Sequence, residues 1–265
     1  MVAVNPVDTL DILRYRDGEW VAQEDQIIRE VPVTIYVNGQ ELVTMLATPR
    51  ELDELALGYL YAEGFLAGTH QMERLVVDPE KNLVQVSLRT DIDRGLKLYG
   101  RRMLTSGCGR GSVFYQSLDA LEVRAISSSF SVSPERVTGL VRQLQDSSLL
   151  FRQTGGVHGA ALADKEEIIL FREDIGRHNA VDKIAGRCLL DGLERGDKLL
   201  LTSGRVSSEI VLKAAKLGVP LLVSPSAPTE LAVQMARRLQ LTLVGFARGK
   251  RFNVYSGAWR LGYGL

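Results

Sequence analysis

The sequence predicts an α/β protein in which a three-layer C-terminal domain follows a smaller α+β N-terminal domain. Three observations support this division. Before residue 130, short alternating strands are joined by turns. After Ser133, helices with one apolar face alternate with short strands. Two of those strands, 199–201 and 221–223, are apolar without alternation, as expected when helices cover both faces of a sheet. We expect domains at 1–130 and 131–265, with the boundary within Val123–Ser133.

The N-terminal domain is expected to hold two hairpins. Val31–Val37 alternates in hydrophobicity, Asn38-Gly39 follows as a turn, and Glu41–Leu46 returns. Pro32 predicts an edge position for the first of these strands, because proline cannot donate to a sheet ladder. The second expected hairpin pairs Arg74–Val77 with Leu83–Leu88. The first dozen residues carry no periodic pattern and are expected to fray.

One helix is expected between these hairpins. Thr48-Pro49-Arg50-Glu51 has the composition of a capping box, with Thr48 as the N-cap and Glu51 closing the box. Gly64 is placed to end the helix. Its apolar face consists of Leu52, Leu55, Ala56, Tyr59 and Leu60.

The C-terminal domain begins with a helix that Ser133-Pro134 opens. Cys188 shares an apolar helical face with Ile184 and is expected in the core. The other elements are expected at these positions: strands near 157–162 and 167–171, a helix at 178–190, a strand at 198–202, a helix at 208–217, a strand at 221–224, a helix at 229–240 and a strand at 241–246.

Composition excludes several classes of function. Lys+Arg and Asp+Glu both number 32, so no net charge recruits nucleic acid or an anionic membrane. No apolar run approaches the roughly 20 residues that span a bilayer. The N-terminus lacks the basic start and apolar core of a signal peptide. We therefore expect a cytoplasmic protein that binds neither nucleic acid nor membrane.

Cys108 lies in the most glycine-rich stretch, T-S-G-C-G-R-G-S. Three glycines within five residues indicate a loop, where the chemistry of a cysteine matters more than its packing. The cation of Arg110 would favour the thiolate, which is the nucleophilic form. A cysteine that merely occupies a turn remains the alternative at this point.

Polar loops follow three expected strands of the C-terminal domain. They are Thr202-Ser203-Gly204-Arg205, Ser224-Pro225-Ser226-Ala227-Pro228 and Ala247-Arg248-Gly249-Lys250-Arg251. Ligands of α/β sheets bind beyond the carboxyl ends of the strands. Hydroxyls, backbone amides near helix N-termini and cations suit a phosphate-bearing ligand. We expect Ser203 and Arg205 to contribute to such a site.

Two histidines lie in dense polar stretches, His158 after Gly155-Gly156 and His178 at the start of a helix. Zinc needs three or four ligands, and the sequence contains no C-x-x-C pair. We therefore expect no metal site.

These motifs resemble the FdhD family, the formate dehydrogenase accessory sulfurtransferases, from about Val31 to Tyr255. The resemblance rests on T-S-G-C-G, T-G-G-V-H-G-A-A-L, R-E-D-I-G-R-H-N-A-V-D-K, T-S-G-R-V-S-S-E and G-F-A-R-G-K-R-F-N-V-Y. It implies a cytidine-deaminase-like second domain without the deaminases' zinc ligands. It also implies that Cys108 takes persulfide sulfur from a cysteine desulfurase and passes it to bis-molybdopterin guanine dinucleotide, the molybdenum cofactor of formate dehydrogenase.

The resemblance further implies that the cofactor binds at Phe246–Arg251, namely Phe246, Ala247, Arg248, Gly249, Lys250 and Arg251, with His158 and His178 nearby. The family usually carries C-G-x-C, whereas Gly111 occupies the second cysteine position here. A disulfide relay is therefore excluded, but transfer through Cys108 alone is chemically sufficient. The alternative is a chaperone that delivers the cofactor without covalent chemistry. A two-fold homodimer is the default assembly.

Overall fold

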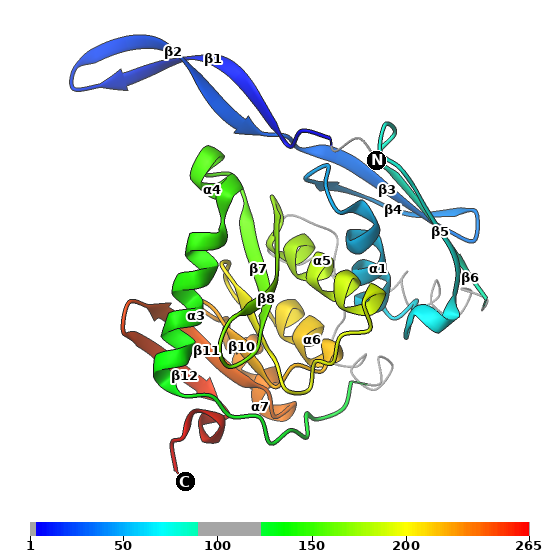
Figure 1. Ribbon diagram of the computed structural model, residues 1–265, viewed down its shortest axis with the longest axis vertical. Helices are drawn as coiled ribbons and strands as arrows, with labels where there is room; N and C mark the ends of the chain where they lie inside the picture. The colour runs from blue at the N-terminus through cyan, green and yellow to red at the C-terminus, as the bar shows by residue number, and fades with distance from the viewer. Residues whose placement is uncertain (1–3, 90–122, 265) are drawn as a thin grey trace.

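A six-stranded sheet in the order β12-β11-β10-β9-β7-β8 lies at the centre of the C-terminal part (Figure 1). The structure is a computed structural model that describes residues 4–89 and 123–264. The strands are β7 (His158–Ala163), β8 (Ile168–Asp174), β9 (Leu199–Thr202), β10 (Leu221–Val223), β11 (Thr242–Arg248) and β12 (Arg251–Ser256). Strands β9, β10 and β11 are parallel, while β7 is antiparallel to β9 and β12 is antiparallel to β11.

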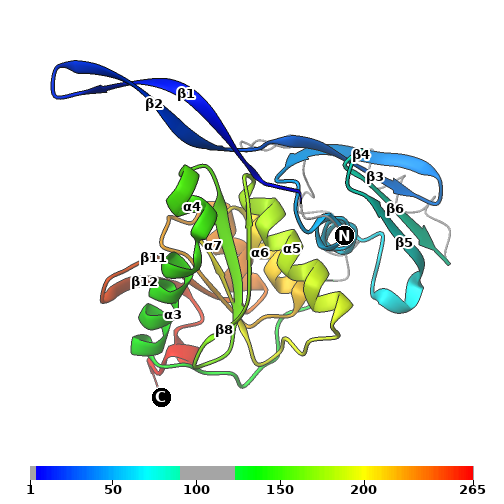
Figure 2. The same cartoon turned by 45° about the horizontal axis from the view of Figure 1, so that its top comes forward.

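Helices cover both faces of this sheet, which confirms the mixed α/β class. On one face, α5 (Arg177–Leu190), α6 (Ser208–Leu217) and α7 (Glu230–Arg238) pack on alternate strand residues such as Leu200 and Leu222. On the other face, α3 (Pro134–Ser147) packs on Leu199 and Leu201 (Figure 2). Because both faces are covered, β9 and β10 are buried at every position.

The predicted helices of this part are confirmed, and their caps explain where two of them begin. Ser133 Oγ accepts a hydrogen bond from Arg136 N at 3.4 Å, and Thr229 Oγ1 accepts one from Ala232 N at 3.2 Å. The short helix α4 (Leu149–Thr154) and strand β12 were not predicted. In the described ranges, none of the helices combines the length and apolar character that crossing a bilayer requires.

The N-terminal part contains a four-stranded sheet in the order β4-β3-β6-β5. Both predicted hairpins are present, as β3 (Val31–Val37) with β4 (Gln40–Ala47), and β5 (Met72–Asp78) with β6 (Leu83–Leu88). The edge position predicted from Pro32 is wrong, because β3 also pairs with β6. That pairing begins only at Thr34, so Pro32 lies beyond the end of the second ladder and its missing amide hydrogen costs nothing there.

The capping box predicted at Thr48 is also wrong. Helix α1 (Leu52–Glu63) begins after Glu51, whose backbone has a left-handed φ of 48° and whose side chain makes no cap hydrogen bond. The Thr48 hydroxyl instead donates to Asp174 Oδ2 at 2.8 Å. A contact 126 residues away in the sequence therefore replaces the local cap. The predicted C-terminus is confirmed, with Gly64 in the left-handed conformation.

The expected fraying of the N-terminus is wrong. Residues Val7–Arg16 form strand β1 and Glu19–Ile28 form strand β2, which pair along their whole length as an antiparallel ribbon that projects from the body (Figure 1). At the base of the ribbon, β2 contacts α4. The mixture of charged and apolar residues in β1 hides a regular alternation from sequence inspection.

Helices α1 and α5 join the two parts of the molecule through close backbone contact. A Cβ atom added at Gly186 of α5 would lie 1.9 Å from Glu54 O of α1, and one added at Gly58 of α1 would lie 1.8 Å from Asp182 O of α5. Each helix thus uses a glycine where the backbone of the other crosses it. The predicted apolar residues of α1 are buried, and so are residues on its other faces, because α5 covers them.

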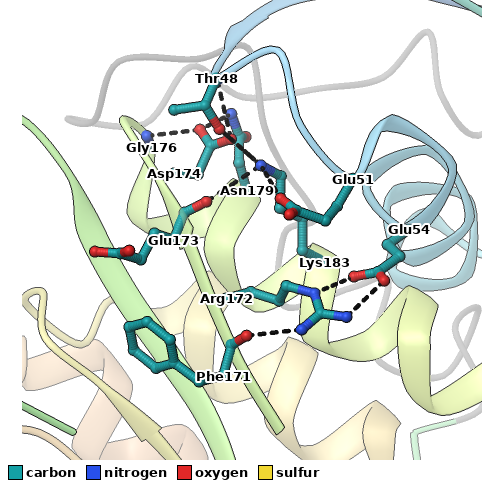
Figure 3. A network of polar contacts seen from close by, with 10 residues as sticks. All are labelled: Thr48, Glu51, Glu54, Phe171, Arg172, Glu173, Asp174, Gly176, Asn179 and Lys183. Carbon is teal, nitrogen blue, oxygen red and sulfur yellow. Dashed lines mark hydrogen bonds and ion pairs between the residues drawn. The ribbon is translucent and has the colours of Figure 1, made fainter. Parts of the chain in front are cut away.

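A buried ion pair lies beside this crossing (Figure 3). Lys183 of α5 is fully buried, and its Nζ lies 2.8 Å from Asp174 Oδ2 and 2.7 Å from Thr48 Oγ1. Asp174 Oδ1 accepts hydrogen bonds from Gly176 N at 3.0 Å and Asn179 Nδ2 at 2.9 Å. The charges of Lys183 and Asp174 are thus paired, and the hydrogen bonds to their neighbours offset the cost of removing both from water.

An ion pair between Arg172 and Glu54 links the two parts directly. Arg172 of β8 holds Glu54 of α1 in a two-pronged contact, with Nη2 to Oε1 at 2.7 Å and Nε to Oε2 at 2.5 Å. Burial raises the pKa of Glu54, although Arg172 acts in the opposite direction. The Arg172–Glu54 ion pair, the hydrogen bonds of Thr48 to the buried Lys183–Asp174 pair and the glycine crossing therefore fix the N-terminal part to α5 and β8.

We predict that Gly186→Ala destabilises the protein by about 2–3 kcal/mol, because the new methyl group meets backbone that cannot move aside cheaply. Urea unfolding followed by circular dichroism measures the change. Gly139→Ala in α3 is the matched control, because no atom lies within 4 Å of its added Cβ, and it should stabilise by about 0.5–1 kcal/mol. Equal effects of the two substitutions would contradict the close crossing.

We predict that Lys183→Met destabilises the protein by about 3–5 kcal/mol, because it leaves the buried carboxylate of Asp174 without its cation. Lys198→Met is the control, since its partner Asp197 has a side chain that is 70% exposed, and the loss should stay below about 1 kcal/mol. The same unfolding measurement applies. A small loss for Lys183→Met would show that the pair does not hold the two parts together.

Candidate functional site

The carboxyl ends of β9, β10 and β11 meet at one edge of the central sheet, as predicted. The start of β7 lies at the same edge, because β7 runs antiparallel to β9. The N-termini of α5 and α6 follow strands that end there. His158, His178 and the pair Ser203 and Arg205 were predicted from three separate stretches, and the fold brings them to this edge.

Ser203 and His158 are in direct contact. Ser203 Oγ accepts a hydrogen bond from Gly159 N at 3.0 Å and lies 3.1 Å from His158 Nδ1. Burial lowers the pKa of His158, and the positive charges of Arg177 and His178 lower it further. The imidazole is therefore neutral near pH 7. When the Ser203 hydroxyl donates to Nδ1, the ring hydrogen stays on Nε2 and is available to a ligand.

His178 belongs to a second cluster, between the N-termini of α5 and α6. Its Nε2 lies 2.9 Å from Glu209 Oε2 and 3.3 Å from Ser207 Oγ. The side chains of His178 and Glu209 are only 19% and 10% exposed. The contact with the carboxylate orients the ring.

Gly204 allows these two clusters to approach each other. A Cβ atom at Gly204 would lie 2.9 Å from Arg177 Cδ and 3.4 Å from His158 Nδ1. The sequence places Gly204, Arg177 and Glu209 within the quoted motifs but assigns them no role in the site, because their roles come from contacts between separate elements. The dense polar run 172–179 was the only available signal for Arg177.

Hydrogen bonds connect the three strand-end loops. Ser224 Oγ donates to Gly204 O at 2.7 Å, which joins the β10 loop to the β9 loop. Ala247 N donates to Ser224 O at 3.1 Å, and Arg248 Nε donates to Pro225 O at 2.8 Å. The loops after β9, β10 and β11 therefore form one connected surface.

Residues 246–251 form the end of a β-hairpin rather than a simple turn. Phe246 and Arg248 belong to β11, and Arg251 begins β12, because the strand extends beyond its predicted end. Phe246 has a left-handed φ of 52° at a register shift and is 42% exposed. Arg248, Gly249, Lys250 and Arg251 are exposed. Ala247 is fully buried in the core on the α3 side, so only its backbone is available to a ligand.

Of the two cysteines in the sequence, Cys188 lies within the described residues. Cys188 is buried in the core as predicted, and burial raises the pKa of its thiol to about 11, so it stays protonated near neutral pH. Cys108, Arg110 and Gly111 lie outside the described residues. Within 4–89 and 123–264, no three His, Cys, Asp or Glu side chains gather in a way that could hold a metal ion.

Comparison with known proteins identifies the family. The FdhD/NarQ family model matches residues 28–262. Over 251 residues, the chain is 43% identical to the sulfur carrier protein FdhD of Bacillus subtilis (strain 168), with 95% of this chain and 96% of that protein covered. The identity to the sulfur carrier protein FdhD of Bacillus licheniformis is 45% over 245 residues, with 92% and 93% covered.

A solved structure shares the fold. It is a crystal structure described as that of a formate dehydrogenase accessory protein from Desulfotalea psychrophila, with a TM-score of 0.81 at 25% sequence identity. The match covers 97% of this chain and 100% of that chain. The family match spans most of the chain, including both parts of the structure and the strand-end loops. This chain therefore belongs to the FdhD/NarQ family.

Proposed function

We propose that this protein is a sulfurtransferase, which carries persulfide sulfur from a cysteine desulfurase to the molybdenum cofactor that formate dehydrogenase requires. The observation that carries the proposal is the match to curated sulfur carrier proteins over 95% of the chain. Support also comes from the solved structure with the same fold, which is described as a formate dehydrogenase accessory protein.

Cys108 is the proposed carrier. Its thiolate attacks the outer sulfur of the desulfurase persulfide, so an S–S bond forms on Cys108 while the donor's S–S bond breaks and the donor cysteine leaves as a thiolate. Transfer to the acceptor breaks the new bond and leaves its electron pair on Cys108. Cys188 is a poor substitute, because its buried thiol has a raised pKa and no exposure to a partner.

The proposed acceptor is bis-molybdopterin guanine dinucleotide, bound as cargo at the edge of the central sheet. Its diphosphate groups are anionic, and Arg205, Arg248, Lys250 and Arg251 are exposed cations of the strand-end loops. Phe246 offers an exposed ring for stacking on guanine. His158, His178 and Ser203 would line the inner part of the site, where the neutral His158 can donate from Nε2.

We also propose that the C-terminal domain has the cytidine-deaminase-like fold. The order of α3, the β7–β8 pair, α5 and the parallel strands supports this assignment. The zinc-binding His and paired cysteines of the deaminases are missing from the sequence, so the fold would be retained without that reaction. The protein would act in the cytoplasm.

A non-covalent cofactor chaperone is the second candidate. The observation that favours it is Gly111, which occupies the position of the family's second motif cysteine. In that case the site at the sheet edge would hold and deliver the cofactor, while Cys108 would carry no sulfur. The two functions differ in whether a covalent protein persulfide forms.

We predict that incubation with a cysteine desulfurase and cysteine adds the mass of one sulfur atom, and that Cys108→Ala abolishes this addition. Intact-protein mass spectrometry measures it. Cys188→Ala is the matched control, which should load sulfur normally and lose only a little stability from its vacated core volume. Full activity of formate dehydrogenase in cells whose only copy is Cys108→Ala would favour the chaperone.

We predict that Arg248→Ala and Arg251→Ala each weaken binding of guanosine diphosphate, and more strongly at low salt, because both remove a cation from the strand-end surface. Isothermal titration calorimetry measures the affinity. Arg142→Ala on the exposed side of α3 removes the same charge elsewhere and should have no effect. Unchanged affinity in both site variants would locate the nucleotide site elsewhere.

A further inference from the structure

A groove lies at the amino ends of the parallel strands, at the end of the central sheet opposite the candidate site. It is lined by the segment 126–129 together with Gln240, Trp259 and Arg260, and it has a volume of about 570 Å³. Gln240 precedes β11, while Trp259 and Arg260 belong to η3 (Ala258–Leu261), the 3₁₀ helix after β12. Figures 1 and 2 show this C-terminal turn in red near the lower end of α3, whereas α4 lies at the upper end. The groove is therefore separate from the strand-end loops.

Arg260 carries the charge of this groove, although the residue is only 3% exposed. Its Nη1 donates to Gln240 O at 2.8 Å and to Thr242 Oγ1 at 3.2 Å. Its Nη2 makes only a long contact, 3.5 Å to Ser128 O, and its Nε has no hydrogen-bond partner among the described residues. Burial lowers the pKa of Arg260, because removal from water disfavours the charged form. One edge of the guanidinium thus combines a desolvated charge with unused hydrogen-bond donors.

Two other shielded cations of this protein have a carboxylate that offsets their burial. Lys183 pairs with Asp174. Arg172 holds Glu54 through Nε and Nη2, the two atoms that have no strong partner in Arg260. This edge of a guanidinium is the one that carboxylates and phosphates bind with two oxygens. None of the residues that line the groove is acidic, so the anion that matches Arg260 has to come from a ligand.

The other residues of the groove suit a phosphate with a planar group attached. Ser127, Ser129 and Gln240 are exposed, and their hydroxyl and amide groups can donate to the several oxygens of a phosphate. The Ser128 hydroxyl instead donates to Gly196 O at 2.7 Å, which holds the segment 127–129 in place. The ring of Trp259 is 50% exposed, and Arg260 Cζ lies 5.2 Å from its centroid. An aromatic surface thus lies directly beside the charge.

We propose that this groove is a second ligand site, which binds a phosphorylated small molecule with its phosphate on Arg260 and its planar group against Trp259. The long contact between Nη2 and Ser128 O is exchanged for a short, charge-assisted bond to a phosphate oxygen. Nε is itself buried, but the phosphate charge acts on it too, because the positive charge is spread over the whole guanidinium. The site lies away from the strand-end loops, and the inference does not depend on the proposed sulfur transfer.

Fluorescence titration of the full-length chain tests the site with inorganic phosphate and phenyl phosphate as probes. The sequence contains two tryptophans, so Trp20→Phe leaves Trp259 as the reporter. We expect both probes to change its emission saturably, with phenyl phosphate binding about fivefold more tightly because its ring stacks on Trp259. The response should persist in Arg248→Ala/Arg251→Ala, which separates this groove from the strand-end loops. A response no larger than that to sodium chloride at equal ionic strength, equal affinities for the two probes, or loss of the response in that variant would overturn the proposal.

Supplying the anion from the chain itself tests the role of the charge. Arg260 also binds Gln240 O and Thr242, so the exposed serines are substituted in its place. We expect Ser127→Asp/Ser129→Asp to weaken phenyl phosphate binding by about tenfold and to raise the melting temperature, because carboxylates then offset the buried charge. Ser131→Asp adds a carboxylate to the same exposed segment outside the groove and should change neither quantity. Undiminished affinity in the double variant, or an equal loss in Ser131→Asp, would overturn the proposal.

Discussion

The buried Lys183–Asp174 ion pair is the interaction on which the arrangement of the two parts depends. Lys183 belongs to α5, Asp174 ends β8, and Thr48 comes from the segment that enters α1, so one charged pair fixes three elements. A charged pair without exposure to water tolerates little displacement, because each group left alone would be costly to bury. The segment that enters α1 is thereby connected to both α5 and β8.

This junction lies at the same edge of the central sheet as the candidate site. Asp174 Oδ1 accepts from Gly176 N, immediately before Arg177 and His178. The segment that anchors the N-terminal part therefore also holds the start of α5, where the His178–Glu209 contact is made. Structural and functional roles overlap within residues 172–183, which explains why this polar run is so dense.

Local patterns predicted most elements correctly because their causes are local. The turn Asn38-Gly39 and the cap Ser133 act over a few residues, and β3, β4 and α3 lie where they predict. The errors come from distant contacts. Thr48 resembles an N-cap, but its hydroxyl bonds to Asp174 instead. That the polar loops meet at one edge of the sheet was predicted from the strand ends. Gly204 and Glu209 were not predicted as site residues, because only the fold shows which side chains they contact.

The distance along the chain between Thr48 and Asp174 has a consequence for biosynthesis. Helix α1 packs its apolar side chains on the N-terminal sheet, but its Gly58 face is covered by α5, which is translated more than 120 residues later. At rates of synthesis of about 5–20 residues per second, roughly 6–25 seconds pass between the synthesis of α1 and that of α5. During this interval the face of α1 around Gly58, which α5 covers in the finished fold, is exposed to solvent or to a chaperone. The completed N-terminal sheet can pair its strands early, but its helix reaches its final state only after α5 has emerged from the ribosome.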